Sequence, residues 1–322
     1  MIEYKVYNKK LIKTWDEFVL QSINGTIFQL QKFISYHKDR IFLDHSLMFY
    51  KNNKLIAVFP AAEVNGALVS HPGASFGGII YKDKSLSDII EIIELIEMYA
   101  KKNNLKNISI IPTPTIYSND QLLPYALKWK KYLEKENYYS SIIPITDNLE
   151  NQLSMIAKNN SRSINFYNSL IEKEKLSIDW SNNFEHFYSL LVQNKKRFNG
   201  KPTHSLSDII KLNDLLPEKI KLLTITKDKV IIGGSLLFLA NQSMGMIFYN
   251  ATNYEHVNSH ASTIQIIELI KWAKDNKLCY LDFGVSHETE NKNPLTPKIS
   301  LIRYKEKFDC LGSLRTIFHK HI

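Results

Sequence analysis

Polar residues that could do chemistry follow an apolar segment near the end of this 322-residue chain. Residues 279–283 read Cys-Tyr-Leu-Asp-Phe, and Gly284 comes directly after them. Burying an unpaired carboxylate at the end of such a strand costs free energy, so we expect Asp282 to face a polar cleft. There it could orient a cation or an amine, or it could cap the turn at Gly284.

Four further side chains could bind or activate a substrate. Arg162, Lys201 and Arg303 could each hold a diphosphate or a carboxylate, or could form an ordinary surface ion pair. His204 follows Lys-Pro-Thr and could act as a base, or it could be a residue at the start of a helix.

Two strands and a helix would position these residues. Residues 244–249 form an apolar run, and residues 278–283 form another. Between them, apolar residues recur at three- and four-residue steps, which predicts an amphipathic helix over 259–276 with Ser259 or Ser262 as its cap. Tyr249 and Asn250 end the first strand, and alternation along that strand leads us to expect both in the cleft as substrate contacts.

The same order of elements occurs twice in the chain. A hairpin at 47–59, a strand at 73–81, a helix at 85–103 and a strand at 107–111 are followed about 175 residues later by equivalent segments. A constant offset predicts a duplicated hairpin–strand–helix–strand unit, and two unrelated α+β domains are the alternative. We place the boundary near Asp147, which gives one domain at 1–147 and another at 148–322.

Composition limits the classes of protein to consider. The formal charge of +9 and pI of about 9.2 favour a polyanionic partner, although a lysine-rich surface also serves solubility alone. No N-terminal apolar run and no span of about 18 apolar residues occur, so neither a signal peptide nor a membrane span is expected. The two cysteines fit a reducing cytoplasm, and we expect Cys279 to be a small core residue.

Common catalytic motifs are missing from the sequence. It contains no His-Glu-x-x-His and no P-loop lysine. Gly233-Gly234 lies within an apolar strand, where we expect a bulge. Only the terminal His319-Lys320-His321 has metal-ligand spacing, so no metal is expected.

Three segments resemble a known family. The stretches "YNATNYEHVNS", "IIELIKWAKDNKLCYLDFGVS" and "LIRYKEKFDCLG" are similar to the C-terminal signature of the Fem-type aminoacyltransferases. These enzymes form a FemAB-like branch of the GNAT acyltransferase superfamily. The resemblance implies an α+β fold of tandem GNAT-like domains, with mixed, mostly antiparallel sheets flanked by helices.

The resemblance also implies roles for individual residues. In GNAT units the fourth and fifth strands splay apart and admit the acyl donor, here between residues 244–249 and 279–283. Tyr304 and Lys305 match the aromatic–lysine pair of the family, which implies that Lys305 contacts the oxyanion or a donor phosphate. Without the resemblance, Lys305 would be a solvated lysine in a charged run. Arg162 matches an Arg-containing helix start, but this chain has Asn165 and Tyr167 where relatives carry further basic residues.

The acyl donor follows from a missing motif. The Arg/Gln-x-x-Gly-x-Gly/Ala loop that binds coenzyme A in many GNAT enzymes is replaced by Glu-His-Val-Asn-Ser-His at 255–260. The sequence thus gives no support for coenzyme A, and we expect no cofactor. The resemblance implies an aminoacyl-tRNA donor of the kind that the Fem family uses, with an acyl-CoA or carrier-bound donor as the alternative.

The sequence thus predicts a cytoplasmic N-acyl or aminoacyltransferase. Its acceptor would be an amine of a cell-envelope precursor, either a peptidoglycan peptide or an amino sugar of a surface glycan. An acyl-CoA- or carrier-dependent enzyme of a nucleotide-linked sugar is one alternative. A GNAT-like module that binds without catalysis is another.

Overall fold

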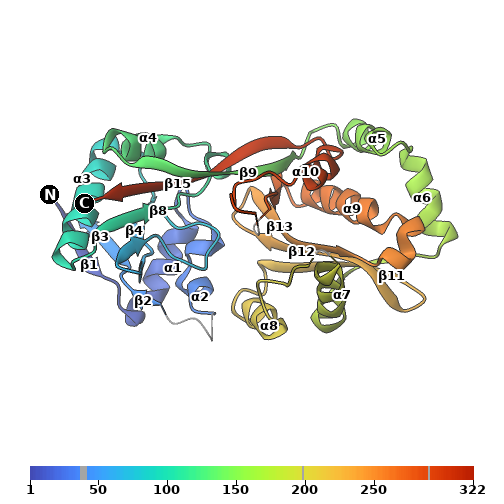
Figure 1. The fold of residues 1–322 in the computed structure, drawn as a ribbon, viewed down its shortest axis with the longest axis horizontal. Coiled ribbons are helices and arrows are strands. Elements are labelled where there is room, and N and C mark those ends of the chain that lie inside the picture. Colours follow the sequence, from blue (N-terminus) through green and yellow to red (C-terminus); the bar gives the residue numbers. More distant parts are fainter. Residues whose placement is uncertain (37–41, 198, 289–290) are drawn as a thin grey trace. The chain divides into compact units, whose positions relative to one another are not determined.

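The structure, a computed structural model, describes residues 1–36, 42–197, 199–288 and 291–322 (Figure 1). Contacts divide it into two compact units, unit 1 with Met1–Tyr139 and Ser313–Ile322, and unit 2 with Ser140–Gly312. The boundary expected near Asp147 assigned the last ten residues to the second domain, whereas their contacts place them in unit 1.

Unit 1 contains two groups of paired strands with helices beside them. The first group is antiparallel throughout, in the order β1 (Ile2–Val6), β3 (Leu47–Lys51), β4 (Lys54–Phe59) and β7 (Ile80–Tyr81). The second runs in the order β15 (Leu311–His321), β8 (Asn107–Ile110), β6 (Ala67–Val69), β5 (Ala62–Val64) and β2 (Leu43–Asp44). The helices are α1 (Ile12–Leu20), α2 (Gln31–Ile34), α3 (Leu86–Lys102) and α4 (Leu122–Trp129), with short 3-10 turns η1 (Lys9–Leu11), η2 (Ile27–Gln29) and η3 (Thr115–Tyr117).

Unit 2 is built on one mixed sheet. Its strand order is β10 (Ser177–Ser181), β11 (Ile220–Lys227), β12 (Val230–Leu239), β13 (Met244–Thr252), β14 (Tyr280–Val285) and the end of β9 (Leu133–Pro144). The pair β13–β14 is parallel, and the other pairs are antiparallel. The helices are α5 (Leu149–Asn159), α6 (Ile164–Lys173), α7 (Phe184–Lys196), α8 (Leu206–Leu215), α9 (Ala261–Asp275) and α10 (Ile299–Glu306), with a 3-10 segment η4 (Tyr254–Ser259).

The predicted repeat is present in the order of elements. β3, β4, β7, α3 and β8 of unit 1 correspond to β11, β12, β13, α9 and β14 of unit 2. Both hairpins turn through two residues with positive φ, Asn52-Asn53 and Asp228-Lys229, as expected of tight hairpin turns. The predicted strand at 73–81 is shorter than expected, because only Ile80–Tyr81 forms ladder pairs.

A long strand follows each repeat and ends in the other unit. β9 begins in unit 1, and its residues 140–144 pair with β14 in unit 2. β15 begins in unit 2, and its residues 318–321 pair with β8 in unit 1. The C-terminal residues therefore complete the sheet of the N-terminal unit.

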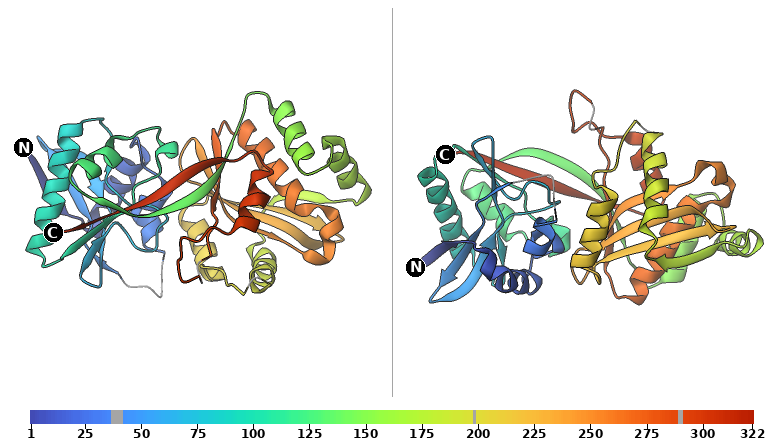
Figure 2. Two further views of the ribbon diagram at one scale, coloured as in Figure 1. Left: turned by 45° about the horizontal axis from the view of Figure 1, so that its top comes forward. Right: turned by 90° about the horizontal axis from the view of Figure 1, so that it is seen from below.

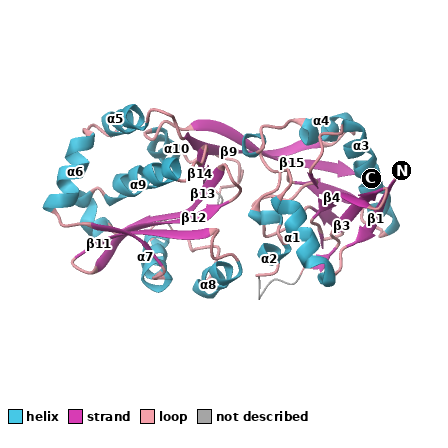
Figure 3. Ribbon diagram, turned by 180° about the vertical axis from the view of Figure 1, so that it is seen from behind, coloured by secondary structure: helices cyan, strands magenta, loops and turns pink. Residues whose placement is uncertain are grey.

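Helices cover both faces of the unit 2 sheet. α9 packs on β11, β12 and β13, and α7 packs on β12 and β13. Figure 3 shows α9 on one side of these strands and α7 and α8 on the other, and the right-hand view of Figure 2 shows α7 and α8 lying across the sheet. One contiguous core joins α9 and α5 to the inner face of the sheet through buried side chains such as Ile156, Ile225, Ile247, Ile267 and Leu281.

Gly233 and Gly234 explain how both helices approach so closely. A Cβ atom on Gly233 would lie 3.0 Å from the Cβ of Ala261 in α9, and one on Gly234 would lie 2.8 Å from Cδ2 of Phe187 in α7. The bulge between β11 and β12 falls beside this pair, at the register shift between Ile225 and Thr226. The glycines thus serve helix packing on both faces as well as the neighbouring bulge.

Substituting Gly234→Ala should lower the free energy of unfolding by about 1–3 kcal/mol, because the new methyl group overlaps the Phe187 ring. Denaturant unfolding of the single variant, of Phe187→Leu and of the double variant would measure this. The alanine should cost less in the Phe187→Leu background, where the ring has been replaced. Equal stability of Gly234→Ala and the wild type would contradict the packing described here.

Candidate functional site

The sheet of unit 2 opens between β13 and β14. The two strands pair from Met244–Tyr280 to Met246–Asp282 and no further, although β13 continues to Thr252 and β14 to Val285. On its other side β13 carries a bulge, because Leu236 pairs with Tyr249 and Leu237 with Ile247, which leaves Phe248 between them. The pairing thus ends at the place where the splayed opening between these two strands is expected.

β14 is irregular at the point where it leaves β13. Its pairing with β9 jumps from Asp282–Ile142 to Val285–Ser140, so Phe283 and Gly284 stand outside the ladder. Gly284 has φ +75°, a left-handed conformation that favours glycine. The backbone groups of this bulge need partners, because buried N–H and C=O groups are costly when unpaired.

Lys305 provides hydrogen-bond partners for two carbonyl groups at this bulge. It lies on α10, only 3% exposed, while its neighbours Glu306 and Lys307 are exposed. Its ammonium donates to the carbonyl oxygens of Gly284 at 2.7 Å and Val285 at 3.3 Å, and it lies 5.3 Å from the Phe283 ring centroid. Lys305 is therefore not a solvated member of the charged run around it.

Asp282 supplies another partner to the same bulge. The fully buried carboxylate accepts hydrogen bonds from the Gly284 backbone N–H at 2.7 Å and from Ser140 Oγ at 2.6 Å. It thus caps the turn at Gly284, which was one of the two roles considered for it. Its role toward a substrate remains a prediction.

Cys310 lies within the electrostatic field of both charged residues. Burial raises the pKa of its thiol to about 12, Lys305 opposes that rise, and Asp282 adds to it. The thiol donates to the Lys305 carbonyl oxygen at 3.1 Å. Lys305 and Asp282 therefore both lie close to Cys310.

The other cysteine, Cys279, is exposed and precedes β14, so the expectation that it would be a core residue was wrong.

Tyr304 fixes α10 against the start of α9. Its hydroxyl donates to the Ser262 carbonyl oxygen at 3.0 Å, and its ring packs edgewise on Phe283 and Phe308. Burial raises the pKa of this phenol, and hydrogen bonds with Asn250 and Ser262 oppose the rise. Tyr304 is thus anchored beside Lys305 as a protonated phenol.

Asn250 belongs to a buried polar group on the same face. Its Oδ1 accepts from Ser235 Oγ at 2.7 Å and from Gln265 Nε2 at 2.5 Å. Gln265 is itself fully buried, and its Oε1 atom has no hydrogen-bond partner. The side chains of Ser235, Asn250 and Gln265 thus form a polar cluster between β12, β13 and α9.

Tyr249 points to the opposite face, toward α7 and α8. Its oxygen accepts the backbone N–H groups of Thr203 and His204, each at 3.1 Å, and lies 2.9 Å from His204 Nδ1. Adjacent residues of a strand alternate between faces, so Tyr249 and Asn250 do not share one cleft. The expectation that both face the same cleft was wrong for this geometrical reason.

The hydrogen bonds of Tyr249 determine the tautomer of His204. Two N–H donors occupy the lone pairs of the phenol oxygen, so its own proton points to His204 Nδ1. Burial raises the pKa of Tyr249, which keeps that proton on the phenol. We infer from this arrangement that His204 Nδ1 is an acceptor and that the ring proton resides on Nε2. His204 holds the chain just before α8, whose N-cap is Ser205.

Three predicted anion contacts are exposed. Arg162 donates to the Ser161 carbonyl oxygen at 2.8 Å and lies over the Phe166 ring. Burial, and after it the charge of Arg162, lowers the pKa of His260, the N-cap of α9. Lys201 and Arg303 are solvent-exposed. Across residues 1–36, 42–197, 199–288 and 291–322, no carboxylate forms an ion pair with any of the three. The alternative of a surface ion pair is thus not realised in the described residues.

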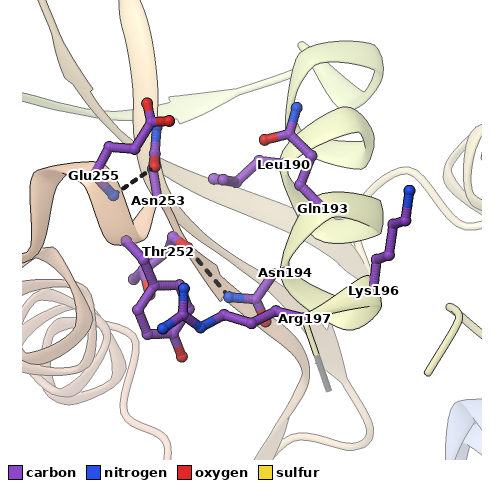
Figure 4. A pocket seen from close by; sticks show the side chains of 9 residues that line it. Leu190, Gln193, Asn194, Lys196, Arg197, Thr252, Asn253 and Glu255 are labelled. Atoms are coloured by element: carbon purple, nitrogen blue, oxygen red, sulfur yellow. Dashed lines mark hydrogen bonds between the residues drawn. The ribbon is translucent and has the colours of Figure 1, made fainter. Parts of the chain in front are cut away.

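A second basic region was missed from the sequence. Lys195 of α7 lies 5.9 Å from the Tyr249 ring centroid, and the pKa of its ammonium is lowered by burial and by the charge of Lys298. Beside it, a hollow of about 390 Å³ separates the end of α7 from residues 252–255 (Figure 4). Arg197 lines this hollow, with its guanidinium 4.2 Å from the Tyr254 ring centroid. The consecutive basic residues Lys195-Lys196-Arg197 are the sequence pattern from which this region could have been predicted.

Metal ligands do not gather in this site. Within the described part of the chain, no three His, Cys, Asp or Glu side chains come close enough to hold a metal ion. No helix among the described residues is long and apolar enough to cross a membrane.

Comparisons place this geometry in a known fold. No family model and no curated protein sequence matches the chain. A crystal structure of FemX superposes with a TM-score of 0.73 at 15% sequence identity, covering 99% of this chain and 97% of FemX. The chain has the fold of FemX.

Two further solved structures superpose on this chain over nearly their whole lengths. The C-terminal domain of a putative lysylphosphatidylglycerol synthetase from Agrobacterium fabrum has a TM-score of 0.61 at 8% identity, with 98% of this chain and 93% of that one covered. A conserved protein of unknown function from Bacteroides thetaiotaomicron has a TM-score of 0.61 at 10% identity, with both chains covered completely. The predicted resemblance to Fem proteins is thus confirmed at the level of the fold.

Replacing Tyr249 by Phe should destabilise the protein by about 2–3 kcal/mol, because two backbone N–H groups and His204 Nδ1 lose their partner. Tyr188→Phe is the matched control, since it removes a hydroxyl that only donates to the His204 carbonyl oxygen, and should cost about 1 kcal/mol. Denaturant unfolding measures both. Nitrogen-15 NMR of the wild type should place the His204 proton on Nε2, and a proton on Nδ1 would refute the assignment.

Proposed function

We propose that the chain is an acyltransferase that moves an acyl or aminoacyl group from an activated donor to an amine of a cell-envelope precursor. The observation that carries this proposal is the buried ammonium of Lys305 at the point where β13 and β14 separate. The amine-bearing acceptor would be a peptidoglycan peptide or an amino sugar of a surface glycan. The FemX fold and the structural similarity to a lysylphosphatidylglycerol synthetase domain support a transfer of this class.

The chemistry is direct attack of a neutral amine on the donor carbonyl carbon. A C–N bond forms, the bond from the carbonyl carbon to the ester oxygen or thioester sulfur of the donor breaks, and the proton lost by the amine neutralises the leaving group. Negative charge develops on the carbonyl oxygen, and a preoriented ammonium in a water-poor site stabilises it. Lys305 is positioned for this role because the bulge carbonyls and α10 fix its ammonium in place.

Asp282 acts in this account through the bulge. By accepting the Gly284 N–H it holds the carbonyl of the same residue toward Lys305. Tyr304 positions Lys305 by anchoring α10 on α9. His204 is not assigned the role of base, because its Nδ1 already accepts the Tyr249 proton.

The donor in this proposal is polyanionic. The net charge of +9 suits an aminoacyl-tRNA, whose phosphates attract a basic protein. At the start of α9, residues 254–259 form a 3-10 segment and His260 is left-handed, where coenzyme A enzymes of this superfamily carry a glycine-rich loop. The exposed Arg162, Lys201 and Arg303, with Lys195 beside Tyr249, are the contacts we assign to donor or acceptor phosphates. The unpaired cysteines fit the reducing cytoplasm in which we place the reaction.

Replacing Lys305 by Met should lower turnover by about 100- to 1000-fold, the loss typical of removing one oxyanion contact. Lys307→Met is the matched control, since Lys307 is an exposed lysine at the end of the same helix. Turnover would be followed by mass spectrometry with charged tRNA and acyl-CoA as donors and with amino-sugar nucleotides and peptidoglycan precursors as acceptors. A circular dichroism melt verifies that both variants fold.

Equal turnover of Lys305→Met and the wild type would contradict the assignment. Binding of a nucleotide-linked sugar without turnover of any donor would instead favour a non-catalytic module. Retention of coenzyme A by the purified protein would overturn the choice of donor.

A further inference from the structure

One surface of unit 1 carries large apolar side chains that are mostly in solvent. Met98 of α3 is 62% exposed, and Tyr125 and Trp129 of α4 are 58% and 57% exposed. Single exposed apolar residues are ordinary on a protein surface, but contiguous ones mark interaction sites. We call these three residues the apolar cluster.

Contacts between α3 and α4 bring the cluster together. The ammonium of Lys130 lies 3.0 Å from Glu94 Oε1 on α3 and 5.8 Å from the Trp129 ring centroid. Met98 lies four residues after Glu94, and Trp129 lies four residues after Tyr125, so each pair shares one stripe of its helix. α3 and α4 thus pack against each other, and Met98, Tyr125 and Trp129 lie on their solvent-exposed sides.

Lysines without carboxylate partners surround the cluster. The three acidic residues nearby are each neutralised, Glu94 by Lys130, Glu97 by Lys320 and Glu134 by Lys128. Lys101 and Lys102 follow Met98 by three and four residues, and Lys131 follows Trp129 by two. These three lysines are exposed, and no carboxylate of the described chain pairs with them. The surface is thus apolar at its centre and positive at its edge.

We propose that this surface docks unit 1 onto a membrane that carries anionic lipids. Trp and Tyr rings are amphipathic and favour the level of the lipid headgroups, where Met98 can reach the acyl chains. Lysines extend their aliphatic stems along the apolar surface and place their ammonium groups among anionic phosphates. An anionic lipid surface would neutralise the positive charge that Lys101, Lys102 and Lys131 leave at the edge of the cluster.

Lys101, Lys102 and Lys131 should contribute an electrostatic part of the binding to an anionic membrane. Each lysine near an anionic surface strengthens binding about fivefold, so removing three should weaken the membrane partition by about 100-fold. Salt should weaken binding in the same direction, because the charges are exposed and screened. The apolar side chains act independently of salt.

The test is co-sedimentation of the full chain with vesicles of phosphatidylcholine alone and with vesicles that also contain phosphatidylglycerol. The wild type should bind the mixed vesicles at least tenfold more tightly, and less tightly at high salt. Tyr125→Ser/Trp129→Ser should lose binding, whereas Leu43→Ser, which removes an equally exposed apolar residue elsewhere in unit 1, should retain it. A melting curve establishes that each variant folds.

A lysine variant provides a second, independent test. Lys101→Gln/Lys102→Gln/Lys131→Gln should show the 100-fold loss, and Lys9→Gln/Lys10→Gln/Lys54→Gln, with the same change in net charge, should bind like the wild type. Equal binding by the two triple variants would overturn the proposal. So would failure of the wild type to bind mixed vesicles, or self-association that Tyr125→Ser/Trp129→Ser abolishes without any lipid binding.

Discussion

The structure of the site depends on the end of one ladder of hydrogen bonds. β13 and β14 stop pairing at Met246–Asp282 while both strands continue, and β14 bulges away from β9 at Phe283 and Gly284. Peptide groups freed in this way cannot stay unpaired inside a protein. Lys305 donates hydrogen bonds to the carbonyl oxygens of Gly284 and Val285, and Asp282 accepts one from the N–H of Gly284. The opening, the buried lysine and the buried aspartate are therefore parts of a single arrangement.

The two faces of β13 carry different functions in this arrangement. On the α9 face, Asn250, Gln265 and Tyr304 hold α9 and α10 beside the opening. On the α7 face, Tyr249 holds the backbone before α8, and Lys195 and Arg197 provide positive charge at the end of α7. Gly233 and Gly234 allow both helices to pack closely on the neighbouring strand. β13 thus connects α9 and α10 on one face with the start of α8 and the basic end of α7 on the other.

Local sequence patterns predicted the helices and strands well, because the spacing of apolar residues that indicates an element lies within the element itself. The spacing of Ile264, Ile267 and Ile270 predicted α9, and Asp282 before Gly284 predicted, as one of two roles, the cap of that turn. The exchange of β9 and β15 was not predictable in this way, because each strand pairs with residues far away in the sequence. The burial of Lys305 has no local signal either, since Glu306 and Lys307 beside it are exposed. The resemblance to Fem proteins pointed to Lys305 as a site residue and not to its burial. Strand alternation was misapplied to Tyr249 and Asn250, and Cys279 was placed inside a strand that begins one residue later.

The most direct test of this account observes the Lys305 ammonium itself. Solution NMR of protein labelled with nitrogen-15 lysine, with Lys305→Met for assignment, would detect it among the solvated lysines. Hydrogen bonds to Gly284 and Val285 should protect this ammonium from exchange with water, which gives a persistent signal that is lost in the variant. If Lys305 exchanges as rapidly as the exposed lysines, its ammonium is not held at the end of β14, and the proposed site is wrong.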